Sequence, residues 1–425
     1  MKILIKGARV IDPANKRDAL CDLLLEKGRI SKIGKKISCA ADKQIDAKDK
    51  VVIPGLVDMH VHLREPGRED KETVASATAA ALRGGVTSVL AMPNTNPAID
   101  RPEQVDLLKQ IIAKSARANV LISAAITVGR QGEKLTEFAN LKSKGAVAIT
   151  DDGFSVDDDQ LMLRALRKAK ANKLLTICHS EDKALSKDGV VNRGIVATRM
   201  GLRGISSESE HNRVERDIKL AAKAKAAVHI AHVSCRQSVE IIAGAKRRGL
   251  QVSAETAPHY FSLSDEDATG FDTNMKVNPP LRSGDDLQAI KQGLRTGVID
   301  AIASDHAPHT VNEKDIEFDR AAFGMIGLET LLSLGLTELV EKKILTLPQL
   351  IEKITVNPAK ILGIAAGSLS LGSPADLVIF DPSKEWLVKR QEIVSKSKNS
   401  PFIGRTLKGL VEYTIHKGQI VYKAQ

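Results

Sequence analysis

The stretch Val57-Asp58-Met59-His60-Val61-His62-Leu63-Arg64 decides how the rest of the chain is interpreted. It follows the apolar run Val51-Val52-Ile53-Pro54-Gly55-Leu56. Because side chains alternate across a β-strand, His60 and His62 lie on the same face. Two imidazoles on one face at the end of a buried strand can hold a metal ion, but they can also line a solvated cleft. A metal site is therefore predicted only if later strand ends supply more ligands.

Short apolar runs alternate with helical patterns through the centre of the chain. The apolar runs are 51–57, 86–92, 120–127, 146–150, 174–178, 227–233, 250–254 and 298–303. The helical patterns are 72–83, 103–116, 133–144, 158–171, 208–226, 237–248, 285–295 and 327–339. Continuous apolar strands are typical of a parallel sheet that is covered on both faces. The rhythm predicts an α/β fold with a (β/α)8 TIM-like barrel. An open doubly wound sheet is the alternative, although no Gly-x-Gly-x-x-Gly follows the first strand.

The two ends of the chain have a different pattern. Short strand-like pieces separated by polar or glycine residues fill the N-terminal part, and similar pieces return near the C-terminus. We expect both ends to join in one small β-sandwich domain, because the termini of a domain are often close together. The predicted division is 1–53 (β domain), 54–366 (barrel) and 367–425 (β domain).

Composition narrows the class of protein. The chain has 425 residues, of which 43% are hydrophobic and 27% charged, as in ordinary globular proteins. Charges at Lys2 and Lys6 interrupt the N-terminus too early for a signal peptide, and no apolar run is long enough to span a bilayer. The four cysteines have no Cys-x-x-Cys spacing and are interpreted as reduced thiols. We therefore expect a cytoplasmic protein that does not bind a membrane.

The formal net charge of +11 raises the question of nucleic acid. The lysines, however, are spread through helical patterns, and aromatic residues are only 3% of the chain, so surfaces on which bases could stack are scarce. Nucleic-acid binding is not expected. An anionic substrate is compatible with the charge but is not required by it.

Residues that commonly bind metals recur at the predicted strand ends, which converge on one face of a barrel. They are Asp58, His60, His62, Asp151, Asp152, His179, His229, His232, Asp305, His306 and His309. Histidines and carboxylates together bind Zn²⁺ or a similar divalent ion. Their number exceeds one tetrahedral site, which indicates two metals, about 3.5–4 Å apart, that share a carboxylate and a hydroxide.

The chain resembles the cyclic amidohydrolases of the dihydroorotase type. Asp58-Met59-His60-Val61-His62-Leu63-Arg64-Glu65-Pro66 is similar to the first signature of that family, and Ala303-Ser304-Asp305-His306-Ala307-Pro308-His309, with Lys314 further on, is similar to the second. Five shorter motifs match in order: Met92-Pro93-Asn94-Thr95, Asp151-Asp152-Gly153, Cys178-His179-Ser180-Glu181, Ala231-His232-Val233-Ser234 and Asn278-Pro279-Pro280-Leu281-Arg282. The resemblance covers nearly the whole chain.

The resemblance implies a set of metal ligands for one or two Zn²⁺ per chain. The ligands are His60, His62 and Asp305 for the first metal, His179 and His232 for the second, and Asp152 between them, as in the bacterial long-chain type. Many relatives bridge the metals with a carbamylated lysine, but residues 145–153 offer no lysine, so carbamylation is not expected. Strand alternation does not decide between Asp151 and Asp152.

The resemblance also implies how the substrate is held. Arg64, Asn94 and His309 would bind a ring carboxylate, for which the Arg fork is suited. Asn278 would bind the ring amide, or it would only shape the Asn-Pro-Pro turn. Phe323 and Gly324 would line the pocket. The alternative for Arg64 is an exposed position, and the loop 310–322 is either a lid or an ordinary solvated loop. Cys178 and Cys235 are interpreted as packing residues.

The activity implied is that of a dihydroorotase, which interconverts N-carbamoyl-L-aspartate and L-dihydroorotate, with Asp305 as the catalytic proton carrier. Two alternatives stay open. One is another cyclic amidohydrolase, such as a dihydropyrimidinase, hydantoinase or allantoinase. The other is a non-catalytic scaffold for aspartate transcarbamoylase. The sequence does not decide whether the chain forms a homodimer or associates with aspartate transcarbamoylase.

Overall fold

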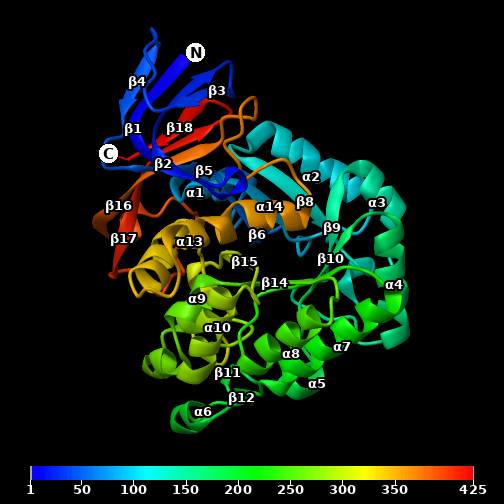
Figure 1. Cartoon of the computed structure of the whole chain (residues 1–425). Coiled ribbons are helices and arrows are strands. Elements are labelled where there is room, and N and C mark those ends of the chain that lie inside the picture. The colour runs from blue at the N-terminus through cyan, green and yellow to red at the C-terminus, as the bar shows by residue number, and fades with distance from the viewer. Residues whose placement is uncertain (1, 425) are drawn as a thin grey trace.

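A barrel of parallel strands forms the centre of the computed structural model, which describes residues 2–424 (Figure 1). Its strands are β6 (Leu56–Val61), β7 (Val86–Ala91), β8 (Asn119–Ala124), β9 (Ala146–Ile149), β10 (Leu175–Cys178), β13 (Val228–Ile230), β14 (Val252–Thr256) and β15 (Ala301–Ile302). They pair in this order. The ring closes after β15, where His306 bridges Val61 in parallel and the His62 N–H donates to the His306 carbonyl at 3.0 Å. The predicted (β/α)8 barrel is confirmed.

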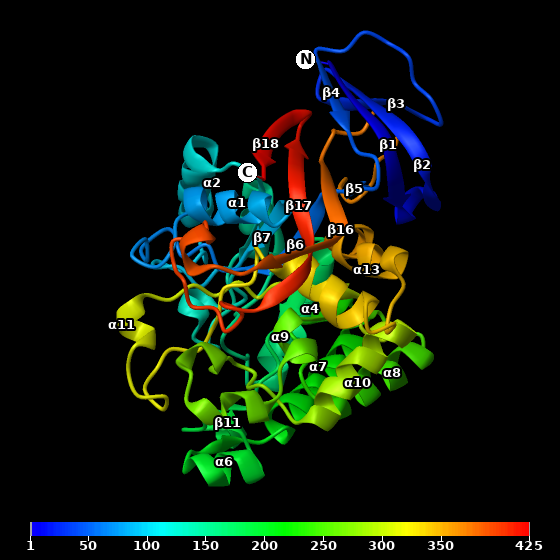
Figure 2. The ribbon, with the colours of Figure 1, turned by 90° about the vertical axis from the view of Figure 1, so that its left-hand side faces the viewer.

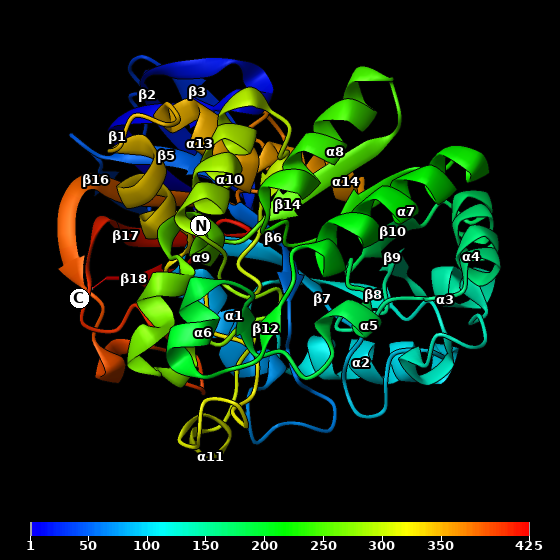
Figure 3. The ribbon, with the colours of Figure 1, turned by 90° about the horizontal axis from the view of Figure 1, so that it is seen from below.

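Helices cover the outside of the barrel, as the view from below shows (Figure 3). Those that follow the strands are α1 (Val74–Arg83), α2 (Pro102–Ser115), α3 (Phe138–Lys144), α4 (Asp159–Ala171), α7 (Glu208–Ala224), α8 (Arg236–Arg247), α10 (Gly284–Thr296) and α12 (Leu331–Gly335). Other elements are α5 (Lys183–Ser186), β11 (Val191–Asn192), α6 (Ile195–Met200), β12 (Gly204–Ile205), α9 (Pro258–Ser262), α11 (Val311–Lys314), α13 (Leu347–Ile354) and α14 (Val356–Leu362).

Local signals account for several helix ends, and one predicted start is wrong. Thr73 and Ser76 form a capping box at the start of α1. Gly145 ends α3 with a φ of +112°, a left-handed conformation that favours glycine. The helix predicted over 133–144 begins later than expected. Leu135 forms a β-bridge with Thr127, and α3 starts only at Phe138.

A second sheet is built from both ends of the chain, and Figure 1 places the two termini in the same part of the molecule. Its strands are β1 (Lys2–Asp12), β2 (Arg17–Glu26), β3 (Arg29–Gly34), β4 (Lys43–Asp46), β5 (Val51–Pro54), β16 (Leu377–Leu387), β17 (Thr406–His416) and β18 (Gln419–Lys423). Their apolar faces share one core, which includes Ile3, Val52 and Leu377. The predicted β-sandwich from both chain ends is confirmed, while the division at 53/54 and 366/367 stays a prediction.

The apolar run 51–57 is divided between the two sheets. It was predicted as one apolar run, with the domain boundary at 53/54 inside it; in the structure β5 pairs with β1 and β16 in the terminal domain, and β6 begins the barrel. The break falls at Gly55, whose backbone lies against the buried Thr87 of β7. A single apolar run therefore carries the chain directly from one domain into the other.

The barrel interior is closed by packing at the end opposite the strand C-termini. Ala359 and Leu362 of α14 pack among inward side chains of the strands, including Val57, Ile177 and Ala301. This packed layer leaves the strand C-termini as the face open for chemistry. No helix within residues 2–424 is both long and apolar enough to cross a membrane.

Gly55→Ala should destabilise the protein by about 1–3 kcal/mol, the usual cost of overpacking a core. A Cβ at this position would lie 2.1 Å from Thr87 Oγ1 and 2.5 Å from Thr87 Cγ2. Chemical denaturation measures the change, and Gly284→Ala, where a Cβ meets nothing within 4 Å, is the matched control. Thr87→Ala should partly rescue the variant. Equal stability of Gly55→Ala and the native protein would contradict this account of the domain junction.

Candidate metal centre and substrate cavity

Six predicted ligands come together at the C-terminal ends of five strands. His60 and His62 belong to the end of β6, and each of the others follows a strand directly or after a few residues: Asp152 after β9, His179 after β10, His232 after β13 and Asp305 after β15. All six residues are buried, with at most 9% of their surface exposed. The barrel thus brings together residues that lie up to 245 positions apart in the sequence.

The first ligand group consists of His60, His62 and Asp305, which are placed so that one ion could contact all three. Asp305 Oδ1 lies 3.6 Å from His60 Nε2 and 3.3 Å from His62 Nε2. Both imidazoles therefore present the same ring nitrogen to one carboxylate oxygen, as alternation along the strand predicts.

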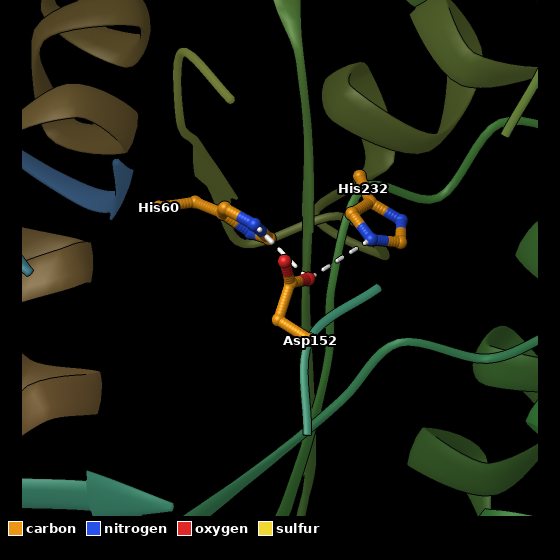
Figure 4. A group of neighbouring side chains, drawn as sticks. All are labelled: His60, Asp152 and His232. Atoms are coloured by element: carbon orange, nitrogen blue, oxygen red, sulfur yellow. Dashed lines mark ion pairs between the residues drawn. The ribbon is translucent and has the colours of Figure 1, made fainter. Parts of the chain in front are cut away.

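Asp152 lies between His60 of this group and His232, as Figure 4 shows. Its Oδ1 is 3.2 Å from His60 Nε2 and 3.7 Å from both His179 Nδ1 and His232 Nε2. Asp151 points elsewhere, because its carboxylate accepts hydrogen bonds from the N–H and hydroxyl of Thr127. Of the two adjacent aspartates, only Asp152 is in a bridging position.

Further polar groups orient the histidine rings from behind. His60 Nδ1 lies 2.8 Å from Glu255 Oε1, and His62 Nδ1 lies 2.9 Å from Asn94 Oδ1, so in each ring Nε2 is left to face the centre. In His179 the arrangement is reversed, with Nε2 3.0 Å from Glu181 Oε2 and Nδ1 facing the centre.

Glu255 is a residue that the sequence analysis missed. It is 1% exposed and lies in β14, one residue beyond the end of the predicted apolar run. A carboxylate inside a buried strand needs a partner, which is the signal that could have revealed it. Its other oxygen is 3.3 Å from His229 Nε2, so His229, also collected at a strand end, is a support and not part of the ligand group.

Three residues of the site adopt strained backbone conformations. The φ angles of Arg64, His232 and Asp305 are +63°, +35° and +48°, in the left-handed region that non-glycine residues rarely occupy. Such conformations cost about 1–3 kcal/mol each and persist where the surrounding structure enforces them. These left-handed conformations give the three side chains directions that a regular strand end would not give them.

The electrostatics of the ligand group fit a bound cation. Within residues 2–424, the ion-pair partners of Asp152 and Asp305 are all histidines. Burial opposes their charged forms, yet the neighbouring imidazoles, His60 first, hold the pKa of both carboxyls below the usual range. His60 Nε2 is fully buried and makes no hydrogen bond of acceptable geometry. A buried imidazole nitrogen without a hydrogen-bond partner, placed between two carboxylates, offers the kinds of ligand atom that a divalent metal binds.

A cavity of about 870 Å³ opens above the ligand group. Arg64 lines it and is only 9% exposed, so the alternative of an exposed Arg64 is wrong. Its Nε donates to the Pro308 carbonyl at 3.1 Å, and one terminal nitrogen lies 3.3 Å from His309 Nε2. Burial lowers the pKa of Arg64 to about 10, which leaves it positively charged at neutral pH.

The other predicted substrate residues line the same cavity: Asn94, Asn278, His309, Phe323 and Gly324. His309 Nε2 donates to the Phe323 carbonyl at 2.8 Å, which joins two of them. Burial, reinforced by the nearby Arg64 and Lys71, lowers the pKa of His309 to about 3, so its ring is neutral. The Asn278 amide donates to Glu181 Oε2 at 3.2 Å and therefore also supports the ligand shell.

The other residues singled out in the sequence make contacts that hold the fold together. Asp58 accepts the N–H of Ser304 and ties β6 to the end of β15, and His306 lies 3.4 Å from Glu72. Cys178 and Cys235 are buried, and burial raises the pKa of both thiols, which fits packing residues. The loop 310–322 carries α11, whose Lys314 is buried and donates to the Ala322 carbonyl at 2.7 Å.

Barrel, ligand group and cavity define a cyclic amidohydrolase of the metal-dependent class, and solved structures agree. An L-hydantoinase (dihydropyrimidinase) from Arthrobacter aurescens aligns with a TM-score of 0.90 at 26% identity, covering 99% of this chain and 96% of that one. A dihydropyrimidinase from Brevibacillus agri NCHU1002 shares the fold at a TM-score of 0.87 and 23% identity, with 100% and 95% covered.

The chain belongs to the dihydroorotase family. Residues 49–238 match the Dihydro-orotase-like family model. A curated dihydroorotase of Elusimicrobium minutum is 50% identical over 99% of this chain and 97% of its own length, and that of Geotalea daltonii is 50% identical over 100% of both. The resemblance inferred from the motifs is therefore confirmed.

Replacing both His60 and His62 by Ala should remove bound metal and activity while the protein remains folded. The two rings face the centre from the end of β6, outside the interior layer that holds the barrel together. Metal analysis of the purified variant and its far-UV circular dichroism measure the two effects. Native metal content or native activity in this variant would contradict the assignment of the site.

Proposed function

We propose that the protein is a dihydroorotase that interconverts N-carbamoyl-L-aspartate and L-dihydroorotate. The observation that carries this proposal is Arg64, a buried cation in the wall of the same cavity as the metal-ligand group. Both compounds carry a carboxylate on the α-carbon, which in the ring lies across from the nitrogen of the amide bond that is made and broken, and an Arg fork in a low-dielectric wall is suited to bind it. Neutral hydantoins and dihydropyrimidines do not require such a group.

We infer that the centre holds one or two Zn²⁺ ions. His60, His62 and Asp305 would hold the first ion, His179 and His232 the second, and Asp152 would contact both. The supporting evidence is the geometry of the two overlapping donor groups and the nature of their atoms, imidazole nitrogen and carboxylate oxygen. A bound divalent ion would polarise the amide carbonyl and make water nucleophilic at neutral pH.

The residues of the chain would supply orientation and proton transfer. Arg64, with Asn94 and His309 beside it, fixes the carboxylated end of the ring, so that the opposite amide carbonyl faces Asp305. Asp305 is ionised at neutral pH, because its pKa is held below the usual range by nearby imidazoles despite burial. It accepts a proton from the attacking water and delivers it to the leaving ring nitrogen; ring closure reverses these steps.

The alternatives differ in their support. Another cyclic amidohydrolase activity is supported by the fold alone, since hydantoinases share it. A non-catalytic scaffold is disfavoured because all six ligand residues are present and brought together. A cytoplasmic location, a homodimer and an association with aspartate transcarbamoylase stay predictions.

A substrate panel tests the proposed activity. We expect turnover of L-dihydroorotate at a kcat/KM far above that of dihydrouracil, hydantoin and allantoin, because only the first has a carboxylate for Arg64. Arg64→Lys keeps the charge but loses the planar fork, and it should weaken the preference for the carboxylated ring. Ring opening is followed by ultraviolet absorbance. Equal or faster turnover of the neutral rings by the native protein would overturn the proposal.

Asp305→Asn should lower kcat by about 10²–10⁴-fold, the usual contribution of general acid–base catalysis. The native enzyme should lose hydrolysis as the pH falls and the carboxylate becomes protonated, while ring closure, which begins with the carboxylic acid form, is favoured there. Because the pKa of Asp305 is lowered, this acid limb should lie below the ordinary carboxyl range. pH–rate profiles in both directions measure it.

The matched control is Asp300→Asn, which removes a carboxylate just before β15, at the end of the strand away from the site. It should retain the native pH profile. If Asp305→Asn kept a near-native rate and the same acid limb, Asp305 would be a ligand at most.

A further inference from the structure

A segment of the C-terminal chain, residues 393–400, crosses from the terminal domain to the barrel face that carries the site. We call it the 393–400 strap. It lies between β16 and β17, and Figure 2 shows this part of the chain, in orange to red, running from the terminal domain past α1. The sequence analysis gave the C-terminal part no functional residue. The contacts of the strap indicate that it has one.

Two buried carboxylates fix the position of the strap. Glu329 accepts the N–H groups of Val394 and Ser395 at 3.0 Å. Glu72 accepts the Ser395 hydroxyl and, at 3.1 Å, the N–H of Lys396. Because both carboxylates bind main-chain N–H groups, the register of the strap against the barrel is set by its backbone.

Asn399 lies near the end of the strap, and both polar atoms of its side-chain amide form hydrogen bonds with residues of the substrate cavity wall. Its Oδ1 accepts the N–H of His309 at 3.1 Å, and its Nδ2 donates to the carbonyls of Ala307 and Gly324, each at 3.1 Å. The residue is 4% exposed. One buried amide therefore joins the segment after β15 to the segment around Gly324.

The two joined segments lie so close together that there is no room for a side chain at Gly324. Gly324 has a φ of +133°, and a Cβ there would lie 2.7 Å from the Ala307 side chain and 3.2 Å from the His309 ring. His309 is in turn within 3.3 Å of Arg64. A change in the spacing between Ala307 and Gly324 would thus shift the groups proposed to hold the substrate carboxylate.

We propose that Asn399 is a positioning residue for the carboxylate-binding part of the substrate cavity, supplied by the terminal domain. It acts through His309 and Gly324, and within residues 2–424 its side chain makes no hydrogen bond to a proposed metal ligand. The inference rests on the proposed dihydroorotase function. It predicts that the loss of Asn399 weakens binding of carboxylated substrates more than it slows the chemical step.

Steady-state kinetics in both directions test the proposal with Asn399→Ala and Asn399→Ser. The KM for L-dihydroorotate and N-carbamoyl-L-aspartate should rise about 10- to 100-fold in Asn399→Ala, the range expected when buried polar groups lose their partners. The rise should be smaller in Asn399→Ser, whose hydroxyl can replace one bond. kcat and metal content should stay near native values. N-carbamoyl-β-alanine, which lacks the α-carboxylate, should inhibit native and variant enzymes with similar Ki.

Asn119→Ala is the matched control, because Asn119 also links barrel and terminal domain, through Asp376, but at the start of β8, away from the cavity. Its KM should be native. The proposal is overturned if Asn399→Ala keeps the native KM, or if its KM rises only together with a loss of kcat and of thermal stability. A native enzyme that does not turn over L-dihydroorotate would instead refute the proposed function.

Discussion

The site depends on one constraint: two buried carboxylates, Asp152 and Asp305, form ion pairs with imidazoles and, within residues 2–424, with no lysine or arginine. Asp152 and Asp305 are each less than one-tenth exposed, and their ion-pair partners are histidines alone. Negative charge in such surroundings is costly without a compensating cation. The arrangement fits a cation site, and the left-handed backbone at His232 and Asp305 is a cost that the fold bears.

The barrel meets this constraint because its strand ends converge. Five of the eight strands contribute one or two ligand residues each, and rigid pairing with the neighbouring strands fixes where those residues point. The rings are then oriented from behind by Glu255, Asn94 and Glu181, so the choice of ring nitrogen is made by the shell around the ligands. Because these supporting residues are themselves polar, more polar residues are buried at this end of the barrel than the six ligands alone would require.

Much of this was predictable from the sequence because the signals were local or periodic. The strand–helix rhythm gave the barrel, and alternation gave the shared face of His60 and His62. The predicted domain boundary at 53/54 falls inside the run 51–57, but the break at Gly55 was not predicted, because an apolar run does not reveal which sheet each half joins. Alternation did not decide between Asp151 and Asp152, and the choice of Asp152 came from the resemblance; the loop after β9 turns Asp151 toward Thr127 and Asp152 toward His60.

Sequence patterns do not reveal which distant residues support the cavity wall. Asn399 lies 90 residues from His309, in an irregular segment with no periodicity, and only the folded chain shows its three hydrogen bonds. This arrangement also gives the split terminal domain a physical rationale. One chain end enters the barrel directly through β5 and β6, and the other returns as the 393–400 strap between the buried Glu72 and Glu329. The substrate cavity is thus braced from outside the barrel, so its wall need not rely on the loops alone for its shape.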